Sequence, residues 1–409
     1  MTSSSKKASW QRNLAALWVG ELIAISGFSV FMPFMPYYVQ ELGVRELDQV
    51  VLWSGLLLSS QAVTMAIAAP VWGSLADRYG RKVMVVRAMF GGAVVISAMG
   101  FVRNVYQLAI LRAIQGTLTG TVPAATTLVA SSTPVKRRGY ALGLLQMAIY
   151  LGSSMGPLIG GLVADSLGYR ATCWVTGGLL FVAGILVSAL VREKFTPPKR
   201  DASEPKPRLW DGLMLVLHTR ALMTVFAIRV LMRTAVRIAG PVLPLFIQAI
   251  APPDTKIASL TGTIAGFASA ASAASAAVLG RVADKVGPRR VLLACGTLAC
   301  VLYALQSQVQ TTTQFLVLRT VSGAAMGGIL ASVSALQASL SPKGRFGAVY
   351  GVDTSLVAAA NAISPMIGAA LTTAWGLSSV FLGAAVMYGI ATVVVAIVVR
   401  KPKAVHDPV

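Results

Sequence analysis

The sequence predicts an all-α membrane protein whose twelve transmembrane helices form two pseudo-symmetric six-helix bundles. Three observations predict it: apolar stretches long enough to cross a bilayer, basic residues concentrated on one side of the predicted membrane, and a repeat that relates the two halves. Apolar residues make up 56% of the 409 positions and charged residues 12%, and the mean hydropathy is +0.72. This composition leaves too little polar surface for a water-soluble globule, so lipid is the expected solvent.

Twelve apolar stretches are predicted to cross the membrane as helices. A span needs about 20 mostly apolar residues, and stretches of that length recur with short polar breaks between them. The first stretch follows basic residues but is too long for a secretory signal and lacks a clear cleavage site, so we expect it to be retained. The predicted spans are 14–39, 50–75, 83–102, 106–130, 140–164, 170–191, 221–248, 257–280, 290–309, 313–338, 346–373 and 377–399.

Basic residues fall mainly on one side of the predicted membrane. With a cytoplasmic N-terminus, only four of the 35 Lys and Arg residues face outward: Arg45, Arg103, Arg170 and Lys256. This asymmetry is the positive-inside rule, so the formal charge of +21 reports topology and contact with anionic headgroups rather than a nucleic-acid partner. We therefore expect a multi-pass protein of the plasma membrane, the inner membrane of a bacterium, with both termini cytoplasmic.

The second half of the chain repeats the first with an offset of 207 or 208 residues. We predict an N-terminal bundle at 1–191 and a C-terminal bundle with a short tail at 221–409. Residues 192–220 contain four prolines among charged residues, which predicts a cytoplasmic linker. The matched pairs are Pro33 and Pro241, Pro36 and Pro244, Gly73 and Gly280, Asp77 and Asp284, Arg112 and Arg319, Gly116 and Gly323, Gly139 and Gly347, Gly143 and Gly351, Pro157 and Pro365, and Gly160 and Gly368.

A charged loop with regularly placed glycines lies between predicted spans two and three and recurs between spans eight and nine. Glycines permit a tight turn, and a carboxylate at a helix end can face the N-terminus of a neighbouring helix. The loop resembles the signature loop of the major facilitator superfamily. The resemblance implies the fold of that superfamily and a substrate site between the bundles near the membrane midplane. It also implies a latch between the two halves on the inner side. The predicted latch residues are Gly73, Asp77, Arg78, Gly80, Arg81 and Asp284.

Span four carries a buried arginine, Arg112, with Gln115 one turn further on. An arginine inside a membrane costs about 2.5 to 3.5 kcal/mol on insertion scales, so something must compensate it. The segment resembles the span-four arginine motif of the superfamily, which implies that Arg112 tunes a nearby acid that carries protons. The alternative is an arginine that binds backbone carbonyls, and the sequence leaves both open.

Span five places Gly152, Gly156 and Gly160 on one helix face, and Pro157 bends it. This segment resembles the antiporter motif of drug-exporting facilitators, which implies export. Close packing against the small residues of span eight around Gly266 explains the same glycines. The segment also fits the G-x-S-x-G nucleophile pattern, but its place inside a span makes a membrane-embedded hydrolase a remote alternative.

Two carboxylates, Glu21 in span one and Asp353 in span eleven, lie clearly inside predicted spans. An acid in a low-dielectric site favours its protonated form and releases the proton as hydration changes. Related drug:proton antiporters often carry an acid in span one, so Glu21 is our first candidate for proton coupling, with Arg112 and Asp353 as further candidates. The alternative for Asp353 is a carboxylate that reaches the inner headgroups.

Span seven carries three arginines, Arg229, Arg233 and Arg237, whose spacing places them on one helix face. Because three arginines cannot face lipid, they predict a cavity that accommodates negative charge. The alternative is a span placed differently, whose arginines reach inward to the headgroups, which would explain Arg229 but hardly Arg237. We expect Arg233, at the centre, to lie nearest the substrate and Arg229 to matter least. Phe28 and Gln115 are also expected to line the substrate cavity.

The resemblance and these residues together predict a monomeric secondary transporter of the twelve-span drug:proton antiporter branch, which exports small amphipathic compounds. The alternative is a facilitator or symporter for an anionic metabolite that binds the span-seven arginines. No G-x-x-x-x-G-K-[ST] segment occurs, so a proton gradient rather than ATP is the expected energy source. We expect no catalytic residue, metal or cofactor, and Cys173, Cys295 and Cys300 lack metal-ligand spacing.

Overall fold

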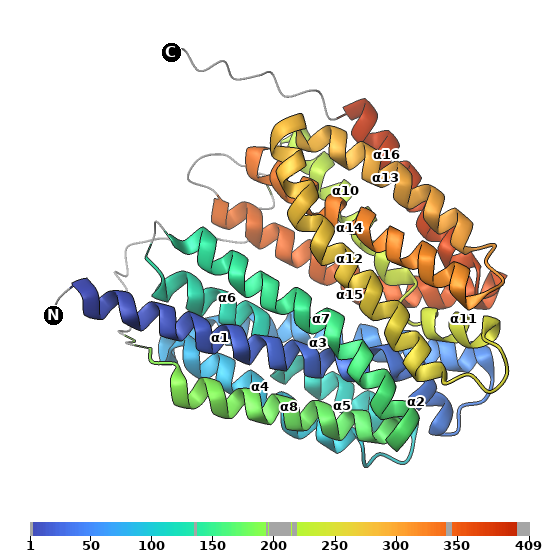
Figure 1. Ribbon diagram of the computed structural model, residues 1–409, viewed down its shortest axis with the longest axis horizontal. Coiled ribbons are helices and arrows are strands. Elements are labelled where there is room, and N and C mark those ends of the chain that lie inside the picture. Colours follow the sequence, from blue (N-terminus) through green and yellow to red (C-terminus); the bar gives the residue numbers. More distant parts are fainter. Residues whose placement is uncertain are drawn as a thin grey trace.

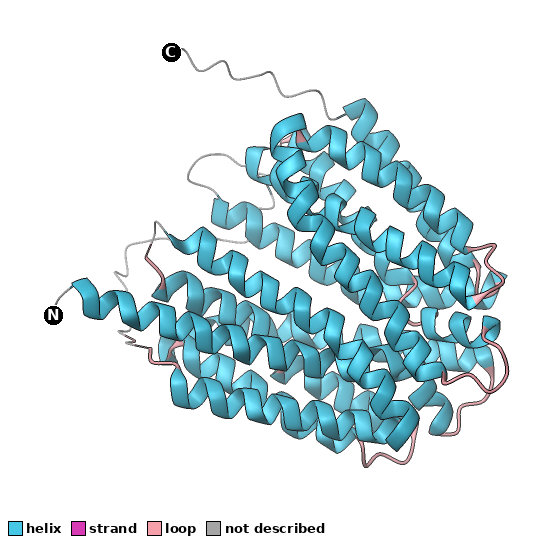
Figure 2. Cartoon of the chain, viewed as in Figure 1, coloured by secondary structure: helices cyan, strands magenta, loops and turns pink. Residues whose placement is uncertain are grey.

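The computed structural model describes residues 3–134, 137–193, 195, 214, 219–340 and 346–398. Within these residues the chain consists of helices and loops, with no strand (Figure 2). Most of the predicted linker at 192–220 lies outside the described residues. The helices of the first half are α1 Ser3–Phe31, a 3-10 turn at Met32–Phe34, α2 Met35–Glu41, α3 Leu47–Tyr79, α4 Arg81–Met99, α5 Val105–Leu118, α6 Thr121–Ser132, α7 Arg138–Leu167 and α8 Tyr169–Leu190.

The second half follows the same order of long helices. Ten helices of the described chain are long and apolar enough to cross a membrane, or eleven if α10 and α11 count as one bent span. The helices are α10 Arg220–Ile238, α11 Leu243–Ile250, α12 Ile257–Val286, α13 Pro288–Gln306, α14 Thr312–Leu340, α15 Phe346–Trp375 and α16 Ser379–Val398.

Three of the predicted spans are interrupted rather than continuous. Span four consists of α5 and α6, each too short to cross alone, because Thr119 is extended and Gly120 has a φ of 133°. Spans one and seven break near Pro33 and Pro241, where the lost backbone N–H groups end the first helix of each pair. Prolines thus stand at equivalent positions just after α1 and α10, and α10 and α11 form a bent pair with an angle of 41°.

Figure 1 shows two bundles, α1 to α8 below and α10 to α16 above, which diverge towards the end that holds both chain termini. We call this the termini end. At the opposite end α2 meets α11, and Gln40 donates a hydrogen bond to Gln248 over 3.3 Å. These two residues are equivalent in the repeat, so the bundles join near a pseudo-twofold axis. We call this the closed end.

The repeat is visible in helix packing as well as in sequence. Gly160 of α7 lies against the backbone carbonyl of Val30 of α1, and Gly368 of α15 lies in the same way against Ile238 of α10. Each position of the first pair is related to its counterpart by 208 residues. The glycines thus pack the fifth helix of each bundle closely onto the first, as small residues do in membrane proteins.

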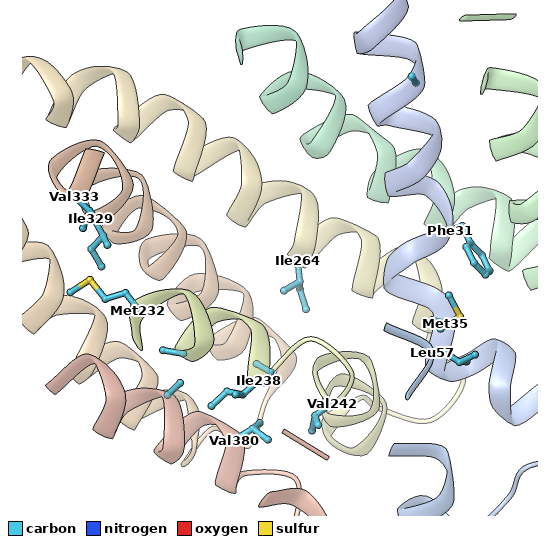
Figure 3. Close-up of a cluster of buried hydrophobic side chains, with 14 of the residues drawn as sticks. Phe31, Met35, Leu57, Met232, Ile238, Val242, Ile264, Ile329, Val333 and Val380 are labelled. Carbon is cyan, nitrogen blue, oxygen red and sulfur yellow. The ribbon is translucent and has the colours of Figure 1, made fainter. Parts of the chain in front are cut away.

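Two helix crossings join the bundles, α7 with α12 and α3 with α15. Gly262 of α12 lies against the carbonyl of Pro157, and the equivalent Gly55 of α3 lies against the carbonyl of Pro365. Buried apolar side chains continue through both bundles, and Figure 3 shows Leu57 from the first half and Val380 from the second as parts of one cluster.

The packing of α7 on α1 predicts the effect of one added methyl group. A Cβ at Gly156 would overlap the backbone of α1 at Ser26 and Ser29, whereas a Cβ at Gly178 of α8 would meet no atom within 4 Å. We expect Gly156→Ala to destabilise the protein by about 1–3 kcal/mol, the usual cost of overpacking, and to lower its melting temperature in detergent. Gly178→Ala is the matched control. Equal melting temperatures for the two variants would contradict this account of the contact.

Candidate functional site

A cavity of about 400 Å³ lies between the two bundles. Helices α1, α3, α7, α10 and α15 contribute to its wall, together with both sides of the break between α5 and α6. Of the predicted cavity residues, Phe28, Gln115 and Arg237 line it, with Asn361 of α15 beside them. Among the described residues that form this wall, no side chain is acidic.

The closed end is held by hydrogen bonds that cross between the bundles. The hydroxyl of Tyr37 donates to the carbonyl of Pro244 over 2.6 Å and lies 2.9 Å from the Thr261 hydroxyl. The carboxylate of Asp165, near the end of α7, accepts hydrogen bonds from the backbone N–H groups of Ala258 and Ser259 over 3.2 and 2.7 Å. Because these groups start α12, Asp165 also meets the positive end of that helix.

The residues predicted to form a latch lie at the termini end. Asp77 and Asp284 are both exposed, and neither has a hydrogen bond or ion pair with any described residue. An added Cβ at Gly73 would meet no atom within 4 Å, and Arg78 lies over the ring of its neighbour Tyr79. Among the described residues, no hydrogen bond or ion pair of Asp77 or Asp284 joins the two bundles.

Glu193, which sequence reasoning missed, braces the turn between α3 and α4. Its carboxylate accepts hydrogen bonds from the backbone N–H groups of Arg81 and Lys82 over 3.1 and 2.8 Å. Gly80 ends α3 with a φ of 99°, and a Cβ there would approach Glu193 to 3.0 Å. The side chain lies more than a hundred positions along the chain, at the start of the predicted linker, so no local pattern could reveal this contact.

Glu21 is fully buried in α1, and neither carboxylate oxygen has a hydrogen-bond partner in the described part of the chain. Helix α6, which begins at Thr121, packs against α1. Ile25, one turn further along α1, lines the cavity, whereas Glu21 does not. The carboxylate is thus occluded just behind the cavity wall.

Arg112 is also fully buried, but it has its own partners. Its Nε donates to the carbonyl of Leu57 over 3.3 Å, and its terminal nitrogens donate to Gln115 over 2.6 Å and to Gln61 over 3.4 Å. Glu21 is not among them. Of the two roles that the sequence left open, this geometry corresponds to an arginine that binds backbone and amide oxygens.

The three arginines of span seven meet a complementary row on α15. Arg229 forms an ion pair with Asp353, with Nε and Oδ1 2.6 Å apart. Arg233 and Arg237 both donate from Nε to Oδ1 of Asn361, over 3.0 and 3.1 Å. Asp353 and Asn361 are eight residues apart and therefore lie on one face of α15, as the arginines do on α10. Sequence reasoning did not find Asn361, because its role depends on which helix packs beside α10.

We expected Arg233 to lie nearest the substrate, but Arg237 is the arginine of this row that lines the central cavity. Arg237 lines this cavity and is exposed, whereas Arg229 and Arg233 line a smaller cavity of about 200 Å³ within the second bundle. The break between α10 and α11 brings the end of α10 to the space between the bundles, so the last arginine of the row reaches it. Asp353 forms an ion pair with Arg229.

The glycines of span five contact a different helix from the one expected. Gly152, Gly156 and Gly160 lie against the backbone of α1, while Gly266 of α12 meets the opposite face of α7 at Leu158. The serine of the G-x-S-x-G pattern lies in the middle of α7 and donates to the carbonyl of Tyr150 over 2.9 Å, as do many serines inside helices. The strand-to-helix turn that a hydrolase nucleophile requires is absent from this segment.

Comparison with known proteins identifies the family. The sequence profile of the Major Facilitator Superfamily matches residues 17–251 and 225–408. The multidrug resistance protein MdtG of Rahnella sp. is 34% identical over 387 residues, covering 93% of both chains, and MdtG of Yersinia enterocolitica is 34% identical over 95% of this chain and 93% of its own. The chain belongs to the major facilitator superfamily.

Solved structures show the same superfamily fold at low sequence identity. A mutant of the nucleoside transporter NupG aligns with a TM-score of 0.78 at 11% identity, over 94% of this chain and 99% of that one. A bacterial homologue of the human lysosomal transporter Spinster, in an inward-facing and unoccupied conformation, aligns with a TM-score of 0.74 at 14% identity, over 97% and 96%. The protein is therefore a membrane transporter of this superfamily and not an enzyme.

The contact of Asp165 with α12 predicts how the closed end opens. A carboxylate at a helix N-terminus contributes about 1 kcal/mol, so we expect Asp165→Asn to raise the population open at this end about fivefold. Distances between spin labels at Gln107 and Gln314, exposed and equivalent positions at this end, would show a larger long-distance component. Glu41→Gln is the control, because Glu41 pairs with Arg170 inside one bundle. The same distance distribution in Asp165→Asn and wild type would contradict the assignment.

Proposed function

We propose that this transporter exports small amphipathic compounds in exchange for protons and that Glu21 carries the proton. The observation that carries the proposal is a fully buried carboxylate without a partner, directly behind the wall of a cavity between the bundles. Such a group is costly inside a membrane unless it is neutral, so its charge is linked to the hydration of the site. The relatives named multidrug resistance proteins support an export function.

The bundles join at the closed end and diverge at the termini end, and this arrangement supports transport by alternating access. If both termini are cytoplasmic, as the distribution of basic residues favours, the structure corresponds to an inward-facing state in which the latch around Asp77 is released. Closure at the termini end would then bring Asp77 towards the second bundle while the contacts of Asp165 break. We propose that a single chain forms the whole pathway, because the cavity draws its wall from both bundles.

One observation favours a second candidate, transport of an anionic metabolite. Arg237 is exposed on the wall of the cavity, and its recorded hydrogen bond uses Nε with the neutral amide of Asn361. The described wall contains no acid to balance it. A guanidinium in this position attracts carboxylate or phosphate groups, so this candidate differs from the first in the charge of the substrate.

The proton-carrying role of Glu21 is tested by Glu21→Gln. The amide cannot take up or release a proton, so we expect transport driven by a pH gradient to be lost in proteoliposomes while substrate binding remains. Exchange of substrate without a gradient should continue. Glu46→Gln, at the exposed start of α3, is the control. If Glu21→Gln retains transport driven by the pH gradient, the proton pathway lies elsewhere and Asp353 is the next carboxylate to test.

The charge preference of the cavity is tested by Arg237→Ala. Removing this guanidinium lowers the positive potential of the cavity, so we expect uptake of anionic and zwitterionic compounds into inside-out vesicles to fall about tenfold relative to cationic compounds. Arg237→Lys should retain most of the preference. Arg233→Ala separates this effect from a general loss of charge in α10, because Arg233 lines the other cavity. An equal change for all substrates would show that Arg237 has no role in selecting them.

A further inference from the structure

The smaller cavity, within the second bundle, lies between α10 and α14, and the proposed transport of protons does not use it. It holds about 200 Å³, and its wall combines two arginines of α10, Arg229 and Arg233, with apolar side chains of α10, α14 and α15. Figure 3 shows Met232 of α10 beside Ile329 and Val333 of α14, which all line this cavity. We call it the α10–α14 cavity.

Helical spacing explains why one wall of this cavity is charged and the other apolar. Arg229 and Arg233 are four residues apart on α10, and so are Met232 and Val236, so each pair lies on one side of the helix. On α14 the residues that line the cavity also recur at helical spacing, and all are apolar: Met326, Ile329, Leu330 and Val333. The cavity therefore presents guanidinium groups on α10 and an apolar surface on α14.

The positive charge of the α10 arginines exceeds the negative charge that meets them. Among the described residues, Asp353 is the one carboxylate that forms an ion pair with this row, and its partner is Arg229. Asn361 accepts a hydrogen bond from Nε of both Arg233 and Arg237, but its amide is neutral. The terminal nitrogens of Arg233, Nη1 and Nη2, donate to no described residue. Because an unpaired guanidinium is costly inside a membrane, an anion bound at Arg233 lowers this cost.

We propose that the α10–α14 cavity is a second ligand site, which binds a small carboxylate with a short apolar tail. The carboxylate accepts hydrogen bonds from Nη1 and Nη2 of Arg233, and the tail lies against Ile329 and Val333. The cavity is smaller than the sites of about 300–1,000 Å³ that hold drug-sized ligands, so its ligand has a few carbons and is not a long-chain fatty acid of the membrane. The cavity lies in the second bundle, so its occupancy does not depend on the proton-carrying role proposed for Glu21.

Photo-crosslinking with hexanoate that carries a diazirine near its methyl end tests the site. On the purified full-length protein in a non-ionic detergent, we expect the probe to label α14 around Ile329, as mapped by mass spectrometry. Excess hexanoate should compete with the probe, whereas hexylamine should not. In Arg233→Gln the probe concentration for half-maximal labelling should rise about tenfold, because hydrogen bonds between charged groups are lost. Arg233→Lys, which keeps the charge, should lose less.

Two further variants separate this site from the central cavity. Val357→Phe places a ring in the α10–α14 cavity without changing any charge, so it should also weaken labelling of α14. Arg237→Gln is the matched control, because Arg237 lines the central cavity, and it should label α14 as wild type does. Unchanged labelling in Arg233→Gln and Val357→Phe would overturn the site, and an equal loss in Arg237→Gln would assign the anion to the central cavity instead. Stronger competition by dodecanoate than by hexanoate would overturn the short tail.

Discussion

The cost of a charged side chain inside a membrane is the constraint on which this structure depends. The arginines within the described spans meet compensating groups, and in most cases that group comes from another helix. Arg229 has a carboxylate, Arg319 the hydroxyl and ring of Tyr303, and Arg87 the ring of Trp72 at 3.4 Å. These contacts fix which helices are neighbours as firmly as apolar packing does. Glu21 has no hydrogen bond or ion pair with any described residue, which distinguishes it from these arginines.

The same constraint explains why the two bundles differ in their charged groups although they share one fold. Their glycine contacts follow the repeat closely, since Gly262 on Pro157 and Gly55 on Pro365 are equivalent crossings. The positions of the charged residues do not follow the repeat. The first bundle contains an unpaired acid beside a broken helix, and the second contains a row of arginines that contact α15. The two bundles thus share their packing contacts but differ in the charged groups that they bury.

Sequence reasoning predicted the features that depend on local pattern. Hydropathy and the repeat located the spans, and the glycines at the ends of α3 and α12 both have the positive φ that their turns require. The partners of buried polar groups could not be predicted, because they depend on helix rotation and neighbour choice. Asn361 and Glu193 are examples. The sequence around Asn361 looks like that of any span, and the sequence around Glu193 looks like that of any linker. The break at Gly120 was missed because a threonine and a glycine in an apolar segment also occur in continuous membrane helices.

The sign of the electrostatic coupling between Glu21 and the cavity separates the two candidate functions. In a low-dielectric site, the negative charge of an ionised Glu21 lowers the electrostatic potential of the cavity. When Glu21 is protonated, no negative charge balances the guanidinium of Arg237. A cationic substrate therefore binds better when the proton has left, and by reciprocity its binding promotes proton release. That linkage produces exchange of substrate for proton. An anionic substrate binds better when Glu21 is protonated, and the same linkage then moves substrate and proton in one direction. The charge of the substrate thus determines whether this site acts as an antiporter or a symporter.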